Sequence, residues 1–424
     1  MMALLLFVSF LVLIFVGVPV AFSLGLSSLL YLFINDIPLN IIPQRMFGGL
    51  NSFVLLCIPG FILAGNLMNS GGITDRIIEF ANRLVGNVRG GLGLANVGAS
   101  MGFGGISGTA LADTASIGSI LIPAMKKQGY GAGFSSAITA SSSVVGPIIP
   151  PSLPMIIVGT LASLSIGDLF LAGIVPGVLI GLGLMIPTYL ISVKRNYPKG
   201  EKSSLKEIWK SFTGAFWALF MTVIILYGIL GGIFTPTEAS VVAVLYAFVI
   251  GIFVYKELPV KKIPEIMLST ITSTAAIMLL VGFANLFGWI LVAEQIPQMV
   301  ADTILGISTN SVIVVLLIIL LVLFVGTFME TIAGLVILFP VLLPVALQIG
   351  MDPIQFGVTM VLAMVIGLVT PPVGVCLFVA SQIGKVSMGT AVRELVPFIS
   401  VLLFILLLVA FVPSITLYLP SLFD

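Results

Sequence analysis

Long stretches without a charged residue are the strongest constraint on how this chain can fold. They cover residues 1–35, 46–74, 90–112, 128–167, 169–193, 211–237, 266–293, 303–329, 353–384 and 395–423. A helix needs about 20 apolar residues to cross the hydrocarbon core of a bilayer, and hydrocarbon forces each spanning segment to satisfy its own backbone hydrogen bonds. Only 8% of the residues are charged, against about 25% in a soluble domain. The sequence therefore predicts an all-α polytopic membrane protein.

Composition and short motifs exclude several classes of function. A net charge of +1 provides no broad basic surface, so no nucleic-acid partner is expected. The chain has no histidine to activate the serine of Gly105-Ile106-Ser107-Gly108, which otherwise fits the motif of rhomboid proteases, and we expect no enzyme. Gly384-Lys385 continues with Val386, so no P-loop is present, and we expect no organic cofactor. Cys57 and Cys376 lie in apolar runs and are expected to be buried rather than disulfide-bonded.

An internal repeat appears when the sequence is compared with itself at one constant offset. This offset places Gly105 on Gly326, Pro123 on Pro344, Gly129 on Gly350, Gly146 on Gly367, Pro150-Pro151 on Pro371-Pro372 and Pro176 on Pro397. The matches are all glycines and prolines, which interrupt helices. We therefore divide the chain into a first helix with an outer loop (1–50), repeat 1 (51–193), a basic arm with two scaffold helices (194–270) and repeat 2 (271–424).

The distribution of charge predicts that the two repeats are inverted in the membrane. Residues 194–210 contain six Lys or Arg and two Glu, and short basic loops stay in the cytoplasm. Counting crossings from this loop makes 90–125 a re-entrant hairpin from the cytoplasmic side and 306–350 a hairpin from the opposite side. The arm 75–89 before the first hairpin has three Arg, whereas the arm 294–302 before the second has no basic residue.

The same count of membrane crossings predicts on which side of the membrane the two termini lie. Residues 1–35 lack a basic region at their start and are too long for the apolar part of a signal peptide. We expect them to form one retained transmembrane helix, with the N-terminus in the cytoplasm and the C-terminus outside.

Each repeat has two expected interruptions of helix, and these are the candidate ion sites. Inverted repeats with broken helices are the construction of secondary transporters, and carbonyl and hydroxyl oxygens suit an alkali cation. Because ionisable residues are scarce here, sodium is favoured over protons, with at least two ions and no transition metal. The candidate sodium ligands are Gly105, Ser107, Thr109, Gly146, Ile149 and Pro150 in repeat 1, and Gly326, Thr327, Glu330, Gly367 and Thr370 in repeat 2.

The N-termini of the half-helices carry positive dipole ends, which favour an organic anion as the solute. The candidate solute-binding residues are Ser107, Asp113, Ser152, Thr370 and Pro371.

Several nearby residues have two interpretations. Asp113 and Glu330 could contact ion or solute, or could hold the hairpin tips as hydrogen-bond acceptors. Ser141, Ser142 and Ser143 could line the path, or bond to the backbone of their own helix. Asn66 and Ser52 could face the cavity. The spacing of Gly173, Gly177 and Gly181 indicates close helix packing rather than a site.

Five motifs resemble the large membrane subunit of tripartite ATP-independent periplasmic (TRAP) transporters, over nearly the whole chain. They are GISGTALADTASIGSILIPAMKKQGY (105–130), GPIIPPS (146–152), SIGDLFLAGIVPG (165–177), GMDPIQFG (350–357) and GLVTPPVGVCLFV (367–379). The amino-acid sequence as a whole is most similar to the branch of the family that imports sialic acid. Two residues depart from the family pattern: Glu330 stands where Asp is frequent, and Cys376 where Asn is common.

The resemblance implies an elevator-type, sodium-driven importer in a bacterial inner membrane, surrounded by lipid, with its C-terminus in the periplasm. The expected partners are a periplasmic substrate-binding protein that delivers the organic acid and a small four-helix membrane subunit on a separate chain. Sialic acid is the expected solute, followed by a C4-dicarboxylate or another organic acid.

Two other transport functions remain open on the residues alone. One is a sodium/dicarboxylate symporter or ion exchanger of similar build that needs no binding protein. The other is a channel, because re-entrant loops also form selectivity filters. The two hairpin tips differ in sequence, whereas filters usually come from symmetric copies, so a channel is less favoured.

Overall fold

The computed structural model describes residues 2–200, 202–308 and 310–423, and every regular element in these ranges is a helix, which confirms the all-α prediction. The first elements are α1 (Met2–Phe15), α2 (Val20–Ile34), α3 (Ile41–Leu50), η1 (Val54–Leu56), α4 (Cys57–Ser70) and α5 (Ile73–Val85). They are followed by α6 (Gly91–Ser107), α7 (Ala110–Lys127), α8 (Ala132–Ser142), η2 (Ser143–Val145), α9 (Leu153–Ala162) and α10 (Ile166–Lys194). The middle of the chain forms α11 (Leu205–Leu230), α12 (Pro236–Val249), η3 (Ile250–Val254), η4 (Val260–Lys262) and α13 (Ile263–Ala293). The last elements are α14 (Ile296–Ile307), α15 (Ser311–Gly326), α16 (Thr331–Gln348), α17 (Pro353–Gly367), α18 (Val375–Gly384), α19 (Met388–Phe411), α20 (Pro413–Leu417) and η5 (Pro420–Leu422).

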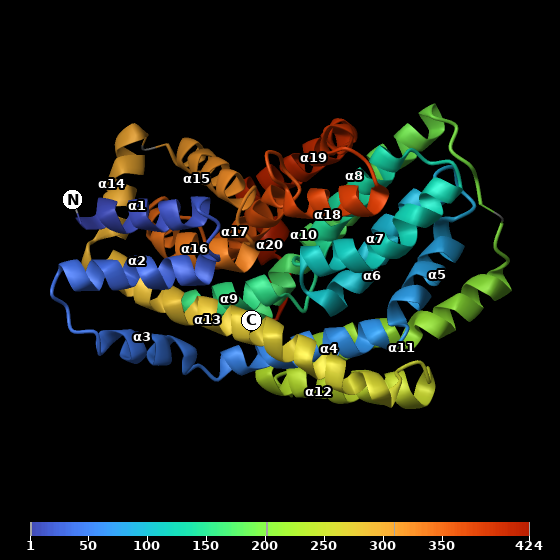
Figure 1. Cartoon of the computed structure of the whole chain (residues 1–424). Helices are drawn as coiled ribbons and strands as arrows, with labels where there is room; N and C mark the ends of the chain where they lie inside the picture. Colours follow the sequence, from blue (N-terminus) through green and yellow to red (C-terminus); the bar gives the residue numbers. More distant parts are fainter. Residues whose placement is uncertain (1, 201, 309, 424) are drawn as a thin grey trace.

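The sequence repeat is a repeat of helices. Helix α16 begins and ends at the residues that the sequence offset assigns to the two ends of α7, and α17 begins where the offset places the start of α8. Hairpin α6–α7 corresponds to α15–α16, and the broken helix α8–α9 corresponds to α17–α18. The arm helices α5 and α14, which precede the two hairpins, lie at opposite ends of the molecule (Figure 1). This arrangement agrees with the prediction of inverted repeats.

Two groups of helices surround the site. Long α13 packs against α2, α3 and α4, and α4 packs along α12. We call these helices together with α11 the scaffold. The hairpins and broken helices pack with one another, with α10 and α19, and with the arm helices α5 and α14. We call the hairpins, the broken helices, α10 and α19 the core.

Local sequence explains where the scaffold helices begin. Thr235 and Glu238 form a reciprocal capping box at the start of α12, with Pro236 at the first helical position. Ser204 and Glu207 form the same box at the start of α11. Each box satisfies backbone N–H groups that the first turn leaves free, so α11 and α12 start at defined residues.

The charge-free stretches do not each form one span. In the described chain, helices long and apolar enough to cross a bilayer alone are α10, α11, α12 with η3, α13 with η4, α16 and α19. Helices α3 and α4, with η1 between them, meet the same criterion only as a pair bent by 71°, which is the geometry of a broken span or of a re-entrant loop. The other apolar helices are shorter because glycine and proline interrupt them.

The expectation of one helix over residues 1–35 is wrong. The chain turns between α1 and α2, where Gly17 has a φ of +91° and Pro19 precedes α2. The two helices pack against each other, and Phe7 and Phe10 of α1 both contact Phe287 of α13. With 14 and 15 residues at about 1.5 Å rise per residue, neither helix crosses a core about 30 Å thick. Residues 2–34 therefore form a third helical hairpin.

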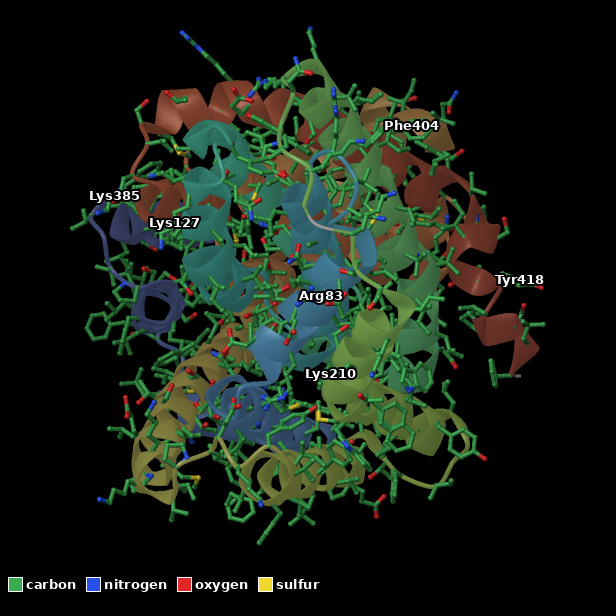
Figure 2. All side chains as sticks on the ribbon, turned by 90° about the vertical axis from the view of Figure 1, so that its right-hand side faces the viewer. Arg83, Lys127, Lys210, Lys385, Phe404 and Tyr418 are labelled. Carbon is green, nitrogen blue, oxygen red and sulfur yellow. The ribbon has the colours of Figure 1, made fainter. Side chains whose placement is uncertain are left out.

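Basic residues gather at the end of the molecule where α5 lies. Figure 2 looks at this end and shows Arg83, Lys127, Lys210 and Lys385, which come from α5, α7, α11 and the end of α18. These helices belong to both repeats and to the scaffold. Because basic ends of membrane proteins stay in the cytoplasm, this end is the expected cytoplasmic face.

An ion pair fixes the arm α5 to the scaffold at this end. Arg76 donates to both carboxylate oxygens of Glu257, at 2.8 and 3.0 Å, and its guanidinium lies 3.9 Å from the ring centroid of Tyr255. Arg76 also donates to the carbonyl oxygen of Gly72 at 2.8 Å. The bidentate bond holds the pKa of the Glu257 carboxyl below its usual value.

Glu257→Gln should weaken the attachment of α5 to the scaffold. It should also make the stability of the protein depend less on pH in the acidic range. Because the pKa of Glu257 is lowered in the folded protein, its contribution is present at neutral pH and lost as the pH falls through the lowered value. Half of the Glu257 side chain is exposed, so the loss should be at most about 1 kcal/mol. The measurement is the thermal unfolding midpoint of purified protein between neutral and acidic pH.

The matched control is Glu79→Gln. Glu79 is an exposed acid on α5, the helix that carries Arg76. If both variants changed the acid dependence equally, the pair with Arg76 would not be its cause.

Candidate functional site

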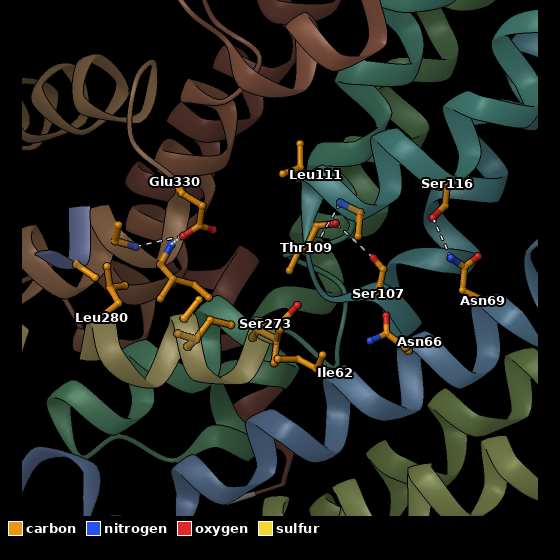
Figure 3. A pocket seen from close by; sticks show the side chains of 18 of the residues that line it. Ile62, Asn66, Asn69, Ser107, Thr109, Leu111, Ser116, Ser273, Leu280 and Glu330 are labelled. Carbon is orange, nitrogen blue, oxygen red and sulfur yellow. Dashed lines mark hydrogen bonds between the residues drawn. The ribbon is translucent and has the colours of Figure 1, made fainter. Parts of the chain in front are cut away.

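The two hairpin tips meet at one cavity of about 590 Å³ between the core and the scaffold. Figure 3 shows Ser107 and Thr109 of the first tip on one side and Glu330 of the second tip on the other, above α4 and α13. The wall is formed by Val20, Ala21, Ile62, Gly65, Asn66, Asn69, Phe103, Ser107, Thr109, Leu111, Ala112, Ser116, Leu153, Ser273, Ala276, Ile277, Leu280, Glu330, Ile332 and Ala333. Residues from both repeats and from the scaffold therefore face the same space.

The first tip is held by a hydroxyl and a buried carboxylate. Ser107 donates to Oδ1 of Asp113 at 2.5 Å, and Thr109 caps α7 by accepting from the Ala112 N–H at 3.4 Å. Asp113 is fully buried. Its Oδ1 therefore accepts a hydrogen bond that holds the tip, whereas its buried Oδ2 has no hydrogen-bond partner among the described residues, and a contact of Asp113 with ion or solute stays a prediction.

The second tip is held by Glu330. Its Oε2 accepts from the backbone N–H groups of Ile332 at 2.8 Å and Ala333 at 3.3 Å, so the carboxylate caps α16. Negative charge at a helix N-terminus is stabilising. Glu330 thus acts as a structural acceptor at the tip, while it also lines the cavity.

In repeat 1 the hairpin tip packs against the broken helix through backbone atoms. A Cβ placed on Gly104 would lie 2.8 Å from Cα of Gly146, and one placed on Gly105 would lie 2.8 Å from the carbonyl oxygen of Pro150. The predicted sodium residues Gly105, Gly146 and Pro150 are thus brought together. Ile149, by contrast, packs its side chain against Gly177 of α10.

Repeat 2 has the same contact. A Cβ placed on Gly367 would lie 2.5 Å from Cα of Gly326, and the Gly374 N–H donates to the carbonyl oxygen of Thr327 at 3.1 Å. The hydroxyls of Thr327 and Thr370 bond to carbonyl oxygens of their own helices, at 2.8 and 2.7 Å. Oxygen atoms from tip and break therefore lie close together, and their role as sodium ligands stays a prediction.

The predicted solute residues do not all reach the cavity. Ser107 lines it, whereas Asp113, Ser152, Thr370 and Pro371 are absent from the wall that the described residues form. Ser152 is fully buried, caps α9 and donates to the carbonyl oxygen of Pro147. The cap of α9 is thus turned into the protein, whereas Thr109 and Glu330, the caps of α7 and α16, face the cavity.

Two polar residues with an open role face different spaces. Asn66 lines the main cavity, as expected. Ser52 lines a separate cavity of about 250 Å³ between α3, η1, α9, α13 and α16. The prediction is therefore confirmed for Asn66, and Ser52 is separated from the main cavity wall.

The three consecutive serines belong to the core. Ser141, Ser142 and Ser143 are buried, and each hydroxyl bonds to a carbonyl oxygen of its own helix. Ser142 also donates to the side chain of Asn96 at 3.0 Å, and Ser143 accepts from Thr114 at 2.8 Å. They join α6, α7 and α8 rather than line the path.

The glycine stripe on α10 packs closely, as predicted. Gly173 lies against the carbonyl oxygen of Ile148, Gly177 against Ile149 and Gly181 against Met101.

Sequence reasoning missed several polar residues of the cavity wall, on the scaffold helices α4 and α13 and on α7 of the core. Asn69, Ser116 and Ser273 line the cavity. For Ser273 a signal exists, because residues 269–274 read STITST inside an otherwise apolar helix. Asn69 and Ser116 are far apart in the sequence and meet only in the folded chain, where the Asn69 amide donates to Ser116 at 3.3 Å.

A family profile covers almost all of this architecture. Residues 7–415 match the family described as "Tripartite ATP-independent periplasmic transporter, DctM component". The chain belongs to the DctM family. It is therefore a multi-pass subunit of a membrane transporter and not an enzyme, as expected. Membership of the DctM family explains why the five motifs in the sequence resemble those of TRAP transporters.

Named members of the DctM family are similar over nearly the whole of this chain. The chain is 45% identical to the sialic acid TRAP transporter large permease SiaM of Vibrio cholerae, over 97% of this chain and 96% of that protein. It is 36% identical to the C4-dicarboxylate permease DctM of Rhodobacter capsulatus, over 100% and 99%. It is 40% identical to the sialic acid permease SiaT of Haemophilus influenzae, over 97% of this chain and 67% of that protein.

The solved YdaH transporter of Alcanivorax borkumensis has a similar fold. It matches with a TM-score of 0.62 at 15% identity, over 88% of each chain. The similarity concerns the fold alone.

Gly367→Ala should disrupt the contact between the second tip and its broken helix. The new Cβ would meet backbone atoms of Gly326, which cannot rotate away, so we expect a loss of about 1–3 kcal/mol or more. The thermal unfolding midpoint of the purified protein should fall, and uptake in proteoliposomes with it.

Gly288→Ala on α13 is the control, because nothing lies within 4 Å of a Cβ placed there. Equal unfolding midpoints for the two variants would contradict the close contact.

Proposed function

We propose that this DctM subunit carries out sodium-coupled uptake of a carboxylated solute. The observation that carries the proposal is a cavity of about 590 Å³ lined by both hairpin tips, with each tip packed on the broken helix of its own repeat. A solute between the tips and ions behind them would be bound together. Sodium binding would then favour the solute-binding arrangement, which is the physical basis of coupling.

The chemistry of the tips supports sodium as the coupling ion. Tip and break in each repeat present carbonyl and hydroxyl oxygens without a histidine in the chain, and such neutral oxygens suit an alkali cation. We assign one ion to each repeat, at least two in total. The first lies among the repeat 1 residues predicted from the sequence, and the second among those of repeat 2.

The relatives support an organic acid as the solute. Two of them are named for sialic acid and one for C4-dicarboxylates. We place sialic acid first, followed by a C4-dicarboxylate or another organic acid. Polar side chains on an otherwise apolar wall suit a solute that is oriented by a few hydrogen bonds.

The description of the family as one component of a tripartite periplasmic transporter supports two partners. We propose a periplasmic substrate-binding protein that delivers the solute and a small four-helix membrane subunit on a separate chain. The complex would lie in a bacterial inner membrane.

The division into scaffold and core supports an elevator movement, in which the core carries the solute past a fixed scaffold.

The hairpin α1–α2 changes the expected side of the membrane for the N-terminus. Tyr31 of α2 donates to Glu294 at the end of α13, and α1 runs back beside α2 (Figure 1). We therefore propose that the N-terminus lies in the periplasm, with the ends of α2 and α13, and we keep the C-terminus there.

Cysteine labelling tests this orientation. Both native cysteines are buried, so a single added cysteine reports its own side. A membrane-impermeant maleimide applied to right-side-out vesicles should label Leu39→Cys and a cysteine tag at the N-terminus, but not Lys261→Cys. Labelling of Lys261→Cys from outside, or protection of the N-terminal tag, would contradict the proposed topology.

Ser107→Ala and Thr370→Ala should each raise, severalfold, the sodium concentration needed for half-maximal uptake, because each removes an oxygen at one proposed ion site. Uptake is measured in proteoliposomes with the partner subunits. Ser400→Ala removes an exposed hydroxyl on α19 and should change nothing. Unchanged sodium dependence in both site variants would refute the assignment.

A carrier that needs no binding protein is the second candidate. Uptake by the chain alone in proteoliposomes, without the binding protein, would favour a sodium/dicarboxylate symporter.

A further inference from the structure

We propose that the separate cavity of about 250 Å³ beside Ser52 is an outer reception site for the solute, with Arg45 at its rim binding the solute carboxylate. We call this space the outer cavity. The inference rests on the proposed function and adds to it a second solute site, which the solute reaches before the main cavity. It follows from the wall of the outer cavity, from its position beside the main cavity and from the charge at its rim.

The wall of the outer cavity offers neutral hydrogen-bonding groups. Its polar side chains are Ser52, Thr160 of α9 and Asn285 of α13, and none of the described residues that line it is charged. Asn285 uses one amide N–H to donate to the carbonyl oxygen of Val281 at 2.9 Å. Its amide oxygen and second N–H remain available. The outer cavity can therefore exchange hydrogen bonds with the hydroxyls and amides of an organic acid.

Arg45 lies one helical turn outside this wall. Its guanidinium is 4.9 Å from the ring centroid of Trp289 on α13. One turn further along α3, Gly49 packs against Asn285, which is one turn earlier on α13, so the two helices are antiparallel. Gly49 and Asn285 both line the outer cavity. Arg45 and Trp289 thus flank the cavity about 5.4 Å closer to the end of α13.

The charge of Arg45 is available to a ligand. Its side chain is exposed, and no ion pair joins it to an acid in the part of the chain that the structure describes. Glu294, the acid that follows Trp289, instead accepts from the hydroxyl of Tyr31. A guanidinium stacked on an aromatic ring can still donate from its edge, and two parallel N–H groups match a carboxylate.

Arg45 is also exceptional among the charges of its face. It belongs to α3, at the end of the molecule opposite α5 (Figure 1). The other Lys and Arg residues lie on the proposed cytoplasmic side, within 76–89, 126–127, 194–210, 256–262 and 385–393. The proposed outer side carries acids, among them Asp168, Glu238 and Asp352. An anion that arrives from outside is therefore repelled by most charges of this face and attracted at Arg45.

One turn of apolar side chains separates the outer cavity from the main cavity. Helices α9, α13 and α16 line both spaces. The residues that face the main and the outer cavity, in that order, are Leu153 and Ile157 on α9, Leu280 and Val281 on α13, and Ile332 and Val336 on α16. All of them are buried. A solute in the outer cavity would thus lie close to the hairpin tips and still be kept from them.

This partition lies where the core meets the scaffold, so an elevator movement would change it. Helices α9 and α16 belong to the core, whereas α3 and α13 belong to the scaffold. When the core moves outward along α13, the tips come level with the outer cavity and can take the solute from it. Arg45 and Asn285 stay in place, as the fixed half of the reception site.

Uptake by Arg45 variants tests the site. Proteoliposomes with the small membrane subunit receive rising amounts of the binding protein loaded with N-acetylneuraminate. Reception follows delivery, so Arg45→Gln should lower the maximal rate at least about fivefold, with little change in the half-saturating concentration of binding protein. Arg45→Lys, which keeps the charge, should retain most of the rate. Lys262→Gln, an exposed position on η4, should change neither quantity.

Protection of a cysteine in the outer cavity locates the solute without transport. Both native cysteines are buried, so Thr160→Cys reports on this cavity alone. A small membrane-impermeant methanethiosulfonate is added to right-side-out vesicles. N-acetylneuraminate should slow the reaction severalfold, whereas the neutral sugar N-acetylmannosamine should slow it much less. Adding Arg45→Gln should remove the protection.

The outcomes separate the inference from the proposed function. If the wild-type complex takes up no carboxylated solute, the proposed function is wrong, and the inference with it. If uptake occurs but Arg45→Gln matches the wild type, only the inference is overturned. The same holds if more binding protein restores the rate of Arg45→Gln, which would make Arg45 a docking contact, or if N-acetylneuraminate does not protect Thr160→Cys.

Discussion

Burial of non-helical backbone in the middle of a membrane protein is the constraint on which this structure depends. Hydrocarbon offers no hydrogen bonds, so an interrupted helix survives only where other protein atoms enclose it. Here each break is covered by the hairpin tip of its own repeat, and glycines let the two backbones approach, as Gly104 does with Gly146 and Gly367 with Gly326. Because side chains are missing at these contacts, oxygen atoms of tip and break gather there. The requirement for backbone satisfaction thus also produces the candidate ion sites.

The cavity exists because the repeats are inverted. Hairpins that enter from opposite ends bring their tips together near the middle, and the scaffold helices α4 and α13 close the remaining side. Inversion relates the two tips by position but leaves their chemistry free to differ. The cap of α7 is Thr109, and the cap of α16 is Glu330. The two helix ends that face the cavity are therefore chemically unlike.

The sequence predicted the elements whose signals are local or repeated. Absence of charge indicated the membrane, and a single constant offset located both hairpins and both broken helices. It failed for residues 1–35, where Gly17 and Pro19 are only two residues in a long apolar run. Whether such a run spans the membrane or folds back depends on what it packs against, in this case α13 and Phe287.

By itself, the sequence determined that this is a membrane protein with two inverted repeats, and it named the residues that interrupt the helices, because glycine, proline and charge act through the chain near them. The tertiary structure decided which of these residues face the cavity. It buried Asp113 and Ser152, exposed Asn66 to the cavity, and brought in Ser273 and Asn69 from the scaffold. The physical reason is that a cavity wall is made by distant segments, and the side of a helix that faces it is fixed only when the neighbouring helices have packed.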